Sequence, residues 1–298
     1  MTDIEKLSQF SEQDVNRVTS KFLKEVSDAL ESVKKPQLII VGGQPGAGKS
    51  GTIRNLKKNF NGNCLFLNYD EFRKDHPNAA AIYTLDDKDE GLYSHFTNEF
   101  MKQVGDKVLK RAFENGYNVI LEKTLKSNKV KKHIDLALKS GYEVNLFVVT
   151  CDKDLSMSAA EYRFRTDRNL YEQNPKKYPP PRKIPREFHD LCCEKLGETA
   201  QKLSDTYKDK IKNFKIVRRD KFFEQDIVFD KSLGYDATKI KETIDCIIAG
   251  KSRKLSDMEK AQISVMKRIS KIRPFKTGPD REKEMGQEKT DEGRSFED

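Results

Sequence analysis

The sequence predicts an α/β fold in which helices cover both faces of a mostly parallel sheet. Short apolar runs recur between residues 37 and 220 and alternate with segments of helical periodicity, the pattern of β–α–β units. The first runs are continuous rather than alternating, as expected of strands that are buried on both sides. The first run also leads into a glycine-rich segment and then a helix, which marks the start of the first β–α unit.

The composition narrows the class of protein. The 298 residues allow one large or two modest domains. With 57 Lys+Arg against 48 Asp+Glu, the net charge of +9 favours anionic partners such as nucleotides, nucleic acid or acidic proteins. The five cysteines lack CxxC spacing, which indicates reduced thiols without a zinc site. Neither a signal peptide nor an apolar run of about 20 residues is recognisable, so we expect a soluble, cytoplasmic protein with no membrane partner.

The elements follow in order along the chain. Residues 11–33 have helical periodicity and are expected to form one amphipathic helix that Lys34, Lys35 and Pro36 end. Strands are expected at 37–41, 64–69, 117–122, 142–150, 214–220 and 226–230. Helices are expected at about 49–59, 92–114, 125–141, 153–172, 186–208, 236–249 and 255–272. A proline-rich break at 174–185 separates two of these helices.

The glycine-rich segment is a phosphate loop. Residues 43–50, GQPGAGKS, fit the pattern G-x-x-x-x-G-K-[ST] between a strand and a helix, which is the context that the motif requires. Glycines let backbone N–H groups turn toward phosphates, and the helix N-terminus adds positive charge. Lys49 can reach the β- and γ-phosphates, and Ser50 can ligate Mg²⁺. The expected nucleotide contacts are Gly43, Gln44, Pro45, Gly46, Ala47, Gly48, Lys49, Ser50 and Gly51.

A phosphoryl-transfer enzyme also needs a group that orients and deprotonates the acceptor. Asp70 follows the second strand, and the carboxyl ends of parallel strands face the ligand crevice. It fits a general base, and equally the N-cap of a helical turn that starts at Glu71. Glu122 and Thr124 follow the third strand, where they could contact Mg²⁺ or acceptor hydroxyls, or simply form a strand-end turn.

Several arginines resemble a lid over the triphosphate. Arg163, Arg165 and Arg168 lie on the helix expected at 153–172, and Arg182 lies at the proline-rich break. Arginines on a helix and loop beside a phosphate site can close over the transferring group. Each of them fits a solvated basic face as well.

Together these residues resemble the zeta toxin family, the kinase half of epsilon–zeta and related toxin–antitoxin pairs. The resemblance runs from about residue 37 to 232 and covers, in the family's order, GGQPGAGKS, NYDEFRKDHPN, GYNVILEKTLKS, GYEVNLFVVT and RKIPREFHD. The second segment is the most specific, because an aspartate followed by Phe-x-x-x-His-Pro is not a general feature of phosphate-loop proteins. It reads Asp70, Phe72, His76 and Pro77 here.

The resemblance implies a kinase that transfers the γ-phosphate of ATP or GTP, with Mg²⁺, to the 3′-hydroxyl of the amino sugar of UDP-N-acetylglucosamine. The product would block cell-wall precursor synthesis, and an antitoxin protein would be the partner. By the same resemblance Asp70 is the base, while Lys49, Arg163 and Arg182 complete the catalytic set. The residues expected to contact the sugar nucleotide are Asp106, Glu122, Thr124 and Lys126.

The chain departs from the family where the acceptor would be recognised. The family's Glu-Gly-Thr reads Glu122, Lys123, Thr124, and the arginine that follows it is Lys126, a point charge rather than a fork. Asp106 stands in place of a glutamate and reaches one methylene less far. The sugar nucleotide is therefore less firmly implied than the kinase reaction.

The first lid arginine depends on how the helix is aligned. Alignment from the preceding strand selects Arg163, whereas alignment from the following LYEQNP segment lands on Thr166, about one helical turn away. A one-turn insertion reconciles the two alignments. Arg163 is the expected residue and Arg165 is the second choice.

The motifs divide the chain into four parts. Residues 1–35 are expected to be an N-terminal helix packed on the core, and 36–234 a P-loop NTPase/kinase-like three-layer sandwich, with the arginine lid at about 153–185. A helical C-terminal extension is expected at 235–273. The segment 274–298 has almost no apolar residues, which is typical of disorder.

Two other functions stay open on the sequence. The first is a P-loop kinase for another hydroxyl acceptor, either a nucleic-acid end, which the basic balance favours to a small degree, or a small molecule. The second is a nucleotide-dependent interaction protein that works through the basic segment 251–276, which could also be a solvated helix. Asp70 discriminates between these classes, because a kinase needs a carboxylate beside the γ-phosphate and a binding module does not.

Overall fold

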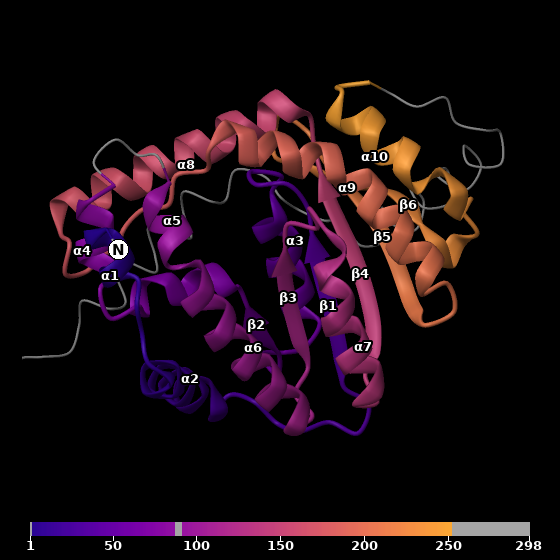
Figure 1. Ribbon diagram of the computed structural model, residues 1–298. Coiled ribbons are helices and arrows are strands. Elements are labelled where there is room, and N and C mark those ends of the chain that lie inside the picture. The colour runs from indigo at the N-terminus through magenta and orange to yellow at the C-terminus, as the bar shows by residue number, and fades with distance from the viewer. Residues whose placement is uncertain (1, 87–90, 252–298) are drawn as a thin grey trace, which may run out of the picture.

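The computed structural model describes residues 2–86 and 91–251 and confirms the α/β class (Figure 1). Within these residues one sheet has the strand order β2-β3-β1-β4-β5-β6. All neighbouring strands are parallel except β5 and β6, which are antiparallel. The strands are β1 Gln37–Gly42, β2 Leu65–Leu67, β3 Val119–Lys123, β4 Glu143–Thr150, β5 Ile211–Arg219 and β6 Gln225–Asp230.

Helices cover both faces of this sheet, as predicted. The helices are α1 Asp3–Leu7, α2 Glu12–Ser27, α3 Lys49–Lys58, α4 Ala79–Thr84, α5 Leu92–Phe96, α6 Asn98–Glu114, α7 Lys131–Lys139, α8 Lys153–Gln173, α9 Arg186–Thr206 and α10 Ile240–Ile248. Short 3₁₀ turns lie at η1 Tyr69–Asp75, η2 Asn128–Val130, η3 Lys231–Leu233 and η4 Ala237–Lys239.

The continuous apolar run of β1 contributes side chains to two separate hydrophobic cores. Leu38 and Ile40 face the larger core, which contains side chains of α2, α6, α7, α9 and α10. Ile39 and Val41 face a smaller core beneath α3. Successive side chains of a strand point to opposite faces, so a strand buried on both sides must be apolar at every position. Figure 1 shows α8 lying across the end of the sheet toward which the strand arrows point.

The first long helix is shorter than predicted. It ends at Ser27 rather than at residue 33. Two turn hydrogen bonds follow, from the Ala29 amide to the Val26 carbonyl and from the Leu30 amide to Ser27. The turn buries the Leu30 side chain in the larger core. The chain therefore leaves the helix because an apolar residue beyond Ser27 packs inward, a tertiary contact that helical periodicity does not report.

The helix expected at 92–114 is also interrupted, at Thr97, between α5 and α6. The buried guanidinium of Arg73 donates to the Ser94 carbonyl oxygen at 2.6 Å and to the Thr97 hydroxyl at 3.0 Å. The Thr97 hydroxyl in turn donates to the Tyr93 carbonyl. Because the Ser94 carbonyl oxygen accepts a hydrogen bond from the Arg73 side chain, the series of backbone hydrogen bonds of the helix is interrupted at this point.

The turn after β3 differs from the prediction as well. The helix expected at 125–141 begins only at η2 and α7, because Leu125 adopts φ 54° and Ser127 is extended. The Leu125 side chain occupies the space where a Cβ on Gly42 would lie, with its Cδ1 only 2.0 Å away. Similarly, β2 ends at Leu67 rather than at residue 69, so that Tyr69 lies in η1 together with Asp70.

The expected helix at 255–272 and the expected disordered tail at 274–298 lie outside the described residues. Of the described helices, none is both long and apolar enough to cross a membrane. The five cysteines are free thiols, three of them buried and two half-buried, in agreement with the prediction.

Candidate functional site

The phosphate loop is wedged between β4 and α8. It leaves β1 at Gly43 and ends at Gly48, which precedes α3 with φ 92°. A Cβ on Gly43 would lie 2.0 Å from the Val149 carbonyl oxygen, and one on Gly46 would lie 1.9 Å from that of Ser156. Only glycine tolerates such a close approach of two backbones. These contacts fix the loop at the carboxyl end of the sheet, where the motif predicted it.

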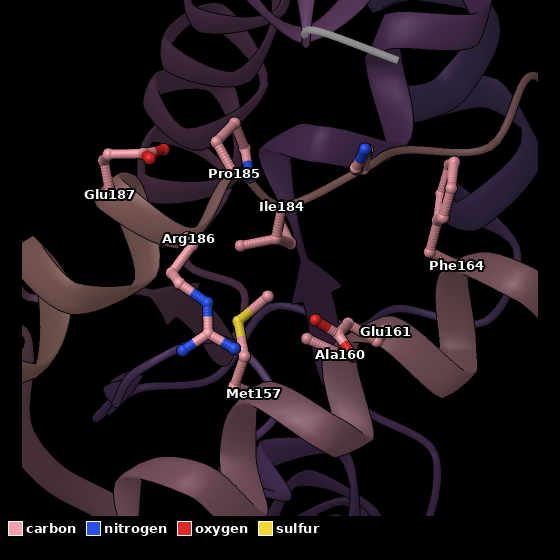
Figure 2. Close-up of a pocket in the computed structure, with 9 residues that line it drawn as sticks. Met157, Ala160, Glu161, Phe164, Ile184, Pro185, Arg186 and Glu187 are labelled. Atoms are coloured by element: carbon pink, nitrogen blue, oxygen red, sulfur yellow. The ribbon is translucent and has the colours of Figure 1, made fainter. Parts of the chain in front are cut away.

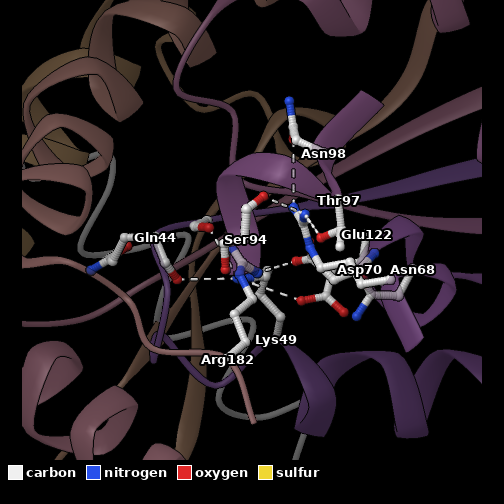
Figure 3. Close-up of polar contacts among 11 residues, drawn as sticks. Gln44, Lys49, Asn68, Asp70, Ser94, Thr97, Asn98, Glu122 and Arg182 are labelled. Atoms are coloured by element: carbon white, nitrogen blue, oxygen red, sulfur yellow. Dashed lines mark hydrogen bonds and ion pairs between the residues drawn. The ribbon is translucent and has the colours of Figure 1, made fainter. Parts of the chain in front are cut away.

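Lys49 lies at the centre of this loop and is 8% exposed. Its Nζ donates to the carbonyl oxygens of Gly43 at 3.0 Å and Gln44 at 3.1 Å, and it lies 3.5 Å from Oε1 of Glu122 (Figure 3). Burial lowers the pKa of Lys49, and the Glu122 carboxylate opposes that shift. The buried Gln44 amide donates to the Cys151 carbonyl at 2.8 Å, which ties the loop to the end of β4.

A second support of the loop comes from the β5–β6 hairpin, which the sequence analysis missed. The buried Arg219 donates to the carbonyl oxygens of Ala47 at 3.2 Å and Gly46 at 3.0 Å. Gln225 donates to the Gly48 carbonyl at 2.8 Å and accepts from the Thr52 hydroxyl at 2.9 Å. Both side chains are more than 170 residues away from the loop in sequence, so no local motif could have revealed them.

Asp70 is held by two arginines. The N-cap of η1 is Asn68, whose side chain accepts from the Asp70 amide, so Asp70 is not the cap. Its Oδ1 accepts from Arg73 Nε at 2.8 Å, and its Oδ2 accepts from Arg182 (Figure 3). Burial raises the pKa of Asp70, but Arg182 and Arg73 outweigh this effect and hold that pKa below its ordinary value. The carboxylate is therefore ionised and fixed at the site.

Arg73 is a positioning residue that the sequence analysis missed. It belongs to the DEFRKD segment that carries Asp70 and is 4% exposed. Through its bonds to Ser94 and Thr97 it fixes η1 against the end of α5, at the junction with α6. The sequence does contain a clue to this role: Arg73 lies three residues after the candidate base, which is about one turn along a helical segment.

The lid arginines reach the site to different degrees. Arg182 comes from the segment between α8 and α9 and bonds directly to Asp70. The charge of Arg163 lowers the pKa of both Lys49 and Asp70. Arg165 is not among the charges that shift these two pKa values, and Arg168 pairs with Glu172 on its own helix at 3.6 Å. The charge distribution thus favours Arg163 over Arg165 as the first lid arginine.

The residues expected to contact the acceptor are engaged with protein groups. Asp106 Oδ1 accepts from Tyr69 at 2.8 Å and lies 3.2 Å from His133 Nε2, while its Oδ2 accepts from Lys132 at 2.6 Å. Burial raises the pKa of Asp106, and hydrogen bonds from His133, Lys132 and Tyr69 more than offset it, so the group is firmly ionised. The Lys126 ammonium lies 4.2 Å from the centre of the Phe188 ring.

Glu122 and Thr124 lie on either side of Lys123 at the end of β3. Glu122 pairs with Lys49 of the phosphate loop. Burial raises the pKa of the Cys192 thiol, and a hydrogen bond from Thr124 partly opposes that shift. Because Glu122 touches the loop lysine directly, this carboxylate belongs to the donor side of the site in the structure.

A cavity of about 390 Å³ lies beside the lid rather than at the phosphate loop. Its walls come from α8 and the segment that leads into α9, with Met157, Phe164 and Ile184 among the lining side chains (Figure 2). None of the phosphate-loop residues lines it. We therefore assign it to the packing of the lid and not to the nucleotide site.

The residues present fit a magnesium ion that is bound mainly through phosphate. Within the described residues no group of three His, Cys, Asp or Glu side chains could hold a metal. Ser50, in the first turn of α3, is exposed and its hydroxyl is available. Mg²⁺ is commonly held by one or two protein groups together with substrate phosphates and waters, which matches this sparse set.

Comparisons with known proteins identify relatives of the chain. The family model described as Zeta toxin matches residues 20–227. Toxin PezT of Streptococcus pneumoniae serotype 4 is 28% identical over 200 residues, which is 67% of this chain and 76% of that protein. Toxin zeta of Enterococcus hirae is 26% identical over 185 residues, which is 62% of each protein. The chain thus spans less than two thirds of the length of the second relative.

Solved structures agree with the fold. A structure of the PezAT chromosomal toxin–antitoxin system of Streptococcus pneumoniae superimposes with a TM-score of 0.66 at 24% identity, covering 89% of this chain and 98% of the other. A structure of AvrRxo1-ORF1 with ORF2 and ATP gives a TM-score of 0.51 at 14% identity, covering 82% and 76%. At these identities the likeness concerns the fold alone.

Proposed function

The chain belongs to the zeta toxin family, a family of kinases of toxin–antitoxin systems, and we propose that it transfers the γ-phosphate of ATP or GTP to the 3′-hydroxyl of the amino sugar of UDP-N-acetylglucosamine. The observation that carries the proposal is the pairing of Asp70 with Arg73 and Arg182 over the carboxyl end of the sheet. This arrangement places a fixed, ionised carboxylate and a lid cation beside the phosphate loop.

On the donor side, the phosphate loop binds the triphosphate. Lys49, which bonds to loop carbonyls in this structure, turns to the β- and γ-phosphates, while Ser50 ligates Mg²⁺. The magnesium ion, when bound, neutralises part of the phosphate charge. Gly46 and Gly48 leave their N–H groups free to face the phosphates because Arg219 and Gln225 hold the loop through its carbonyl oxygens.

On the acceptor side, Asp70 accepts the proton of the attacking hydroxyl. The hydroxyl oxygen forms its bond to the γ-phosphorus as the bond to the β-phosphate oxygen breaks, and the nucleoside diphosphate leaves. Arg182 exchanges its bond to Asp70 for one to the transferring phosphoryl group. Because Arg182 holds the pKa of Asp70 down, this exchange raises that pKa and makes Asp70 a better proton acceptor when the transfer begins.

The toxin role follows from the family. Phosphorylated UDP-N-acetylglucosamine would block cell-wall precursor synthesis, and an antitoxin would bind so as to obstruct the nucleotide site. In this proposal residues 36–234 form the kinase domain with the lid at about 153–185, and 1–35 pack on it. The solved structure with a TM-score of 0.66 comes from the PezAT toxin–antitoxin system, which supports a protein partner here.

The test is direct. The purified chain is incubated with Mg-ATP and UDP-N-acetylglucosamine, and the products are separated and weighed by mass spectrometry. The expected product is the sugar nucleotide with one added phosphoryl group on the amino sugar. Absence of that product together with transfer to the hydroxyl end of an RNA or DNA would contradict the proposal in favour of a nucleic-acid kinase.

A further inference from the structure

The acceptor side of the site contains a cation that the reaction described so far does not use. Lys123 is the last residue of β3, and its side chain follows Val119 and Leu121 onto the face that carries α6 and α7. Its neighbour Glu122 points to the opposite side and pairs with Lys49. The two adjacent residues at the end of β3 therefore divide the site: Glu122 serves the donor and Lys123 faces the acceptor.

The Lys123 ammonium is placed by a buried tyrosine. Its Nζ lies 3.1 Å from the centre of the Tyr69 ring. The ring is fixed from its other side by α6, where a Cβ on Gly105 would lie 2.5 Å from Tyr69 Cγ. The Tyr69 hydroxyl is tied to Asp106 at 2.8 Å. A cation over an aromatic face is attracted by the ring, so the ring acts as a rigid seat for the ammonium group.

This ammonium group has no hydrogen-bond partner among the described protein groups. Within the described residues Lys123 makes the ring contact and no hydrogen bond or ion pair. An ammonium group has three N–H donors, so these donors can bind an anionic oxygen in place of water. The nearby carboxylates do not use them, because Asp106 is bonded to Tyr69, His133 and Lys132, and Asp70 to its two arginines.

We propose that Lys123 is a specificity-determining residue of the acceptor site and that its ammonium binds an anionic oxygen of the acceptor's phosphate groups. This inference rests on the proposed function, in which the acceptor is a sugar nucleotide that carries a diphosphate. Lys126, the other lysine of the turn after β3, is directed to the Phe188 ring instead. Lys123, at the end of β3, is thus the cation on which the charges of both Asp106 and Asp70 act.

The protonation of Lys123 provides a second, independent signature. Burial lowers the pKa of Lys123 to about 7, with Asp106 and Asp70 opposing the shift and Lys132 adding to it. The other titratable groups that face Lys123 keep one protonation state at pH values above 7. Asp70 and Asp106 have lowered pKa values, burial lowers the pKa of His133, and burial raises that of Tyr69. Between pH 7 and 9 the group that changes charge at this position is Lys123.

The pH dependence of acceptor binding has a definite direction. The charged form of Lys123 binds the anion, so acceptor affinity should fall as the pH rises above about 7. About tenfold per pH unit is the limiting slope for one titrating group. In Lys123→Arg the guanidinium stays charged over this range, so the affinity of that variant should not depend on pH between 7 and 9.

The experiment measures binding by calorimetry, with the nucleotide site filled by a non-hydrolysable ATP analogue and Mg²⁺. The proteins are the wild type, Lys123→Met, Lys123→Arg and Lys129→Met, the last being an exposed lysine of η2 that serves as a matched control. The ligands are UDP-N-acetylglucosamine, UDP and uncharged N-acetylglucosamine. We expect Lys123→Met to bind the two diphosphates at least tenfold more weakly, Lys123→Arg within threefold of the wild type, and Lys129→Met like the wild type.

The outcomes separate this inference from the proposed function. Unchanged diphosphate binding by Lys123→Met, while the wild type binds and phosphorylates UDP-N-acetylglucosamine, would overturn the role of Lys123 and leave the kinase proposal intact. An equal loss of affinity for N-acetylglucosamine and for the diphosphates would also overturn it, since a packing defect weakens the binding of charged and uncharged ligands alike. No binding of any diphosphate by the wild type would overturn both the inference and the proposed acceptor.

Discussion

The donor side and the acceptor side of this site are built in different ways. The donor side consists mostly of backbone: Gly43 and Gly46 lie against the carbonyl oxygens of Val149 and Ser156, and in the proposed reaction the N–H groups of the loop bind phosphate. The acceptor side consists of side chains: Tyr69 contacts both Asp106 and Lys123, and the charge of Asp106 acts on Lys123. Backbone recognises any triphosphate, whereas side chains can be exchanged to recognise a particular acceptor.

If the two sides are independent, a change at Asp70 should stop transfer and leave nucleotide binding intact. Asp70→Asn keeps the shape of the side chain and a hydrogen bond to Arg73 but cannot take up the proton. We expect kcat to fall by about 10³-fold or more, with an ATP-analogue affinity within threefold of the wild type. Stopped-time product assays and calorimetry measure the two quantities.

Glu71→Gln is the matched control, because Glu71 is the exposed neighbour of Asp70. It should keep wild-type turnover. Full turnover by Asp70→Asn would exclude Asp70 as the base.

The opposite change is Gly46→Ala, which should damage the donor side first. Gly46 has φ 76°, and the new Cβ would meet the Ser156 carbonyl oxygen at 1.9 Å. We expect nucleotide affinity to fall by about 100-fold, in keeping with a strain of about 1–3 kcal/mol at the loop, together with a lower melting temperature. Gly141→Ala shares the positive φ but has open space around it, so it separates the clash from the backbone strain. Equal nucleotide affinities for the two variants would contradict the wedged loop.

Arg182 connects the two sides, and Arg182→Ala tests that connection. We expect kcat to fall by about 100-fold because one donor to the transferring group is lost. The free energy of unfolding should change by about 1 kcal/mol or less, since the side chain is 23% exposed. Since Arg182 lowers the pKa of Asp70, its removal raises that pKa and moves the acid limb of the kcat/KM profile to higher pH.

Arg73→Ala is the contrast, because Arg73 is 4% exposed and fixes η1 to the end of α5. That variant should lose about 3 kcal/mol of stability as well as activity. A loss of stability in Arg182→Ala as large as in Arg73→Ala would show that Arg182 is a structural residue.

Arg163 and Arg165 test the lid with a smaller effect. The charge of Arg163 bears on Lys49 and Asp70, whereas both side chains are exposed on α8. We expect Arg163→Ala to lower kcat by about tenfold, less than an anchored donor would, and Arg165→Ala to leave it within twofold. The reverse order would assign the first lid arginine to Arg165.

The same division explains what the sequence could predict. The phosphate loop, the mostly parallel sheet of a β–α–β fold and the placement of Asp70 follow from local patterns, and the structure agrees with the first two. The supports Arg219 and Gln225 were missed because they reach the loop from a hairpin that is distant in sequence. The contacts of Asp106 were missed for the same reason, since Tyr69 comes from η1 and Lys132 and His133 come from α7, both distant from Asp106 in sequence.

The predicted boundaries of helices and strands are wrong where tertiary contacts override the periodicity of apolar residues. The helix at 92–114 is interrupted because the side chain of Arg73 takes a carbonyl of its ladder. The turn after β3 is longer than predicted because Leu125 adopts a left-handed conformation. Both deviations lie beside the acceptor side, whereas the helix after the phosphate loop begins at Lys49 as predicted. Local rules therefore fail where a distant side chain decides the backbone conformation, as they also do at the end of α2, where Leu30 packs into the core.

The smallest expected effect, and the most specific, comes from Tyr69→Phe. The variant keeps the ring against Gly105 and beneath Lys123 but removes the hydroxyl that donates to Asp106. Loss of one hydrogen bond is worth about 1 kcal/mol, so KM for the acceptor should rise about threefold to tenfold, with KM for ATP unchanged. Tyr162→Phe, at a tyrosine that is 74% exposed on α8, is the control. A change in KM for ATP as large as that for the acceptor would show that the tyrosine acts on both sides, and that the side-chain half of the site is not separable from the backbone half.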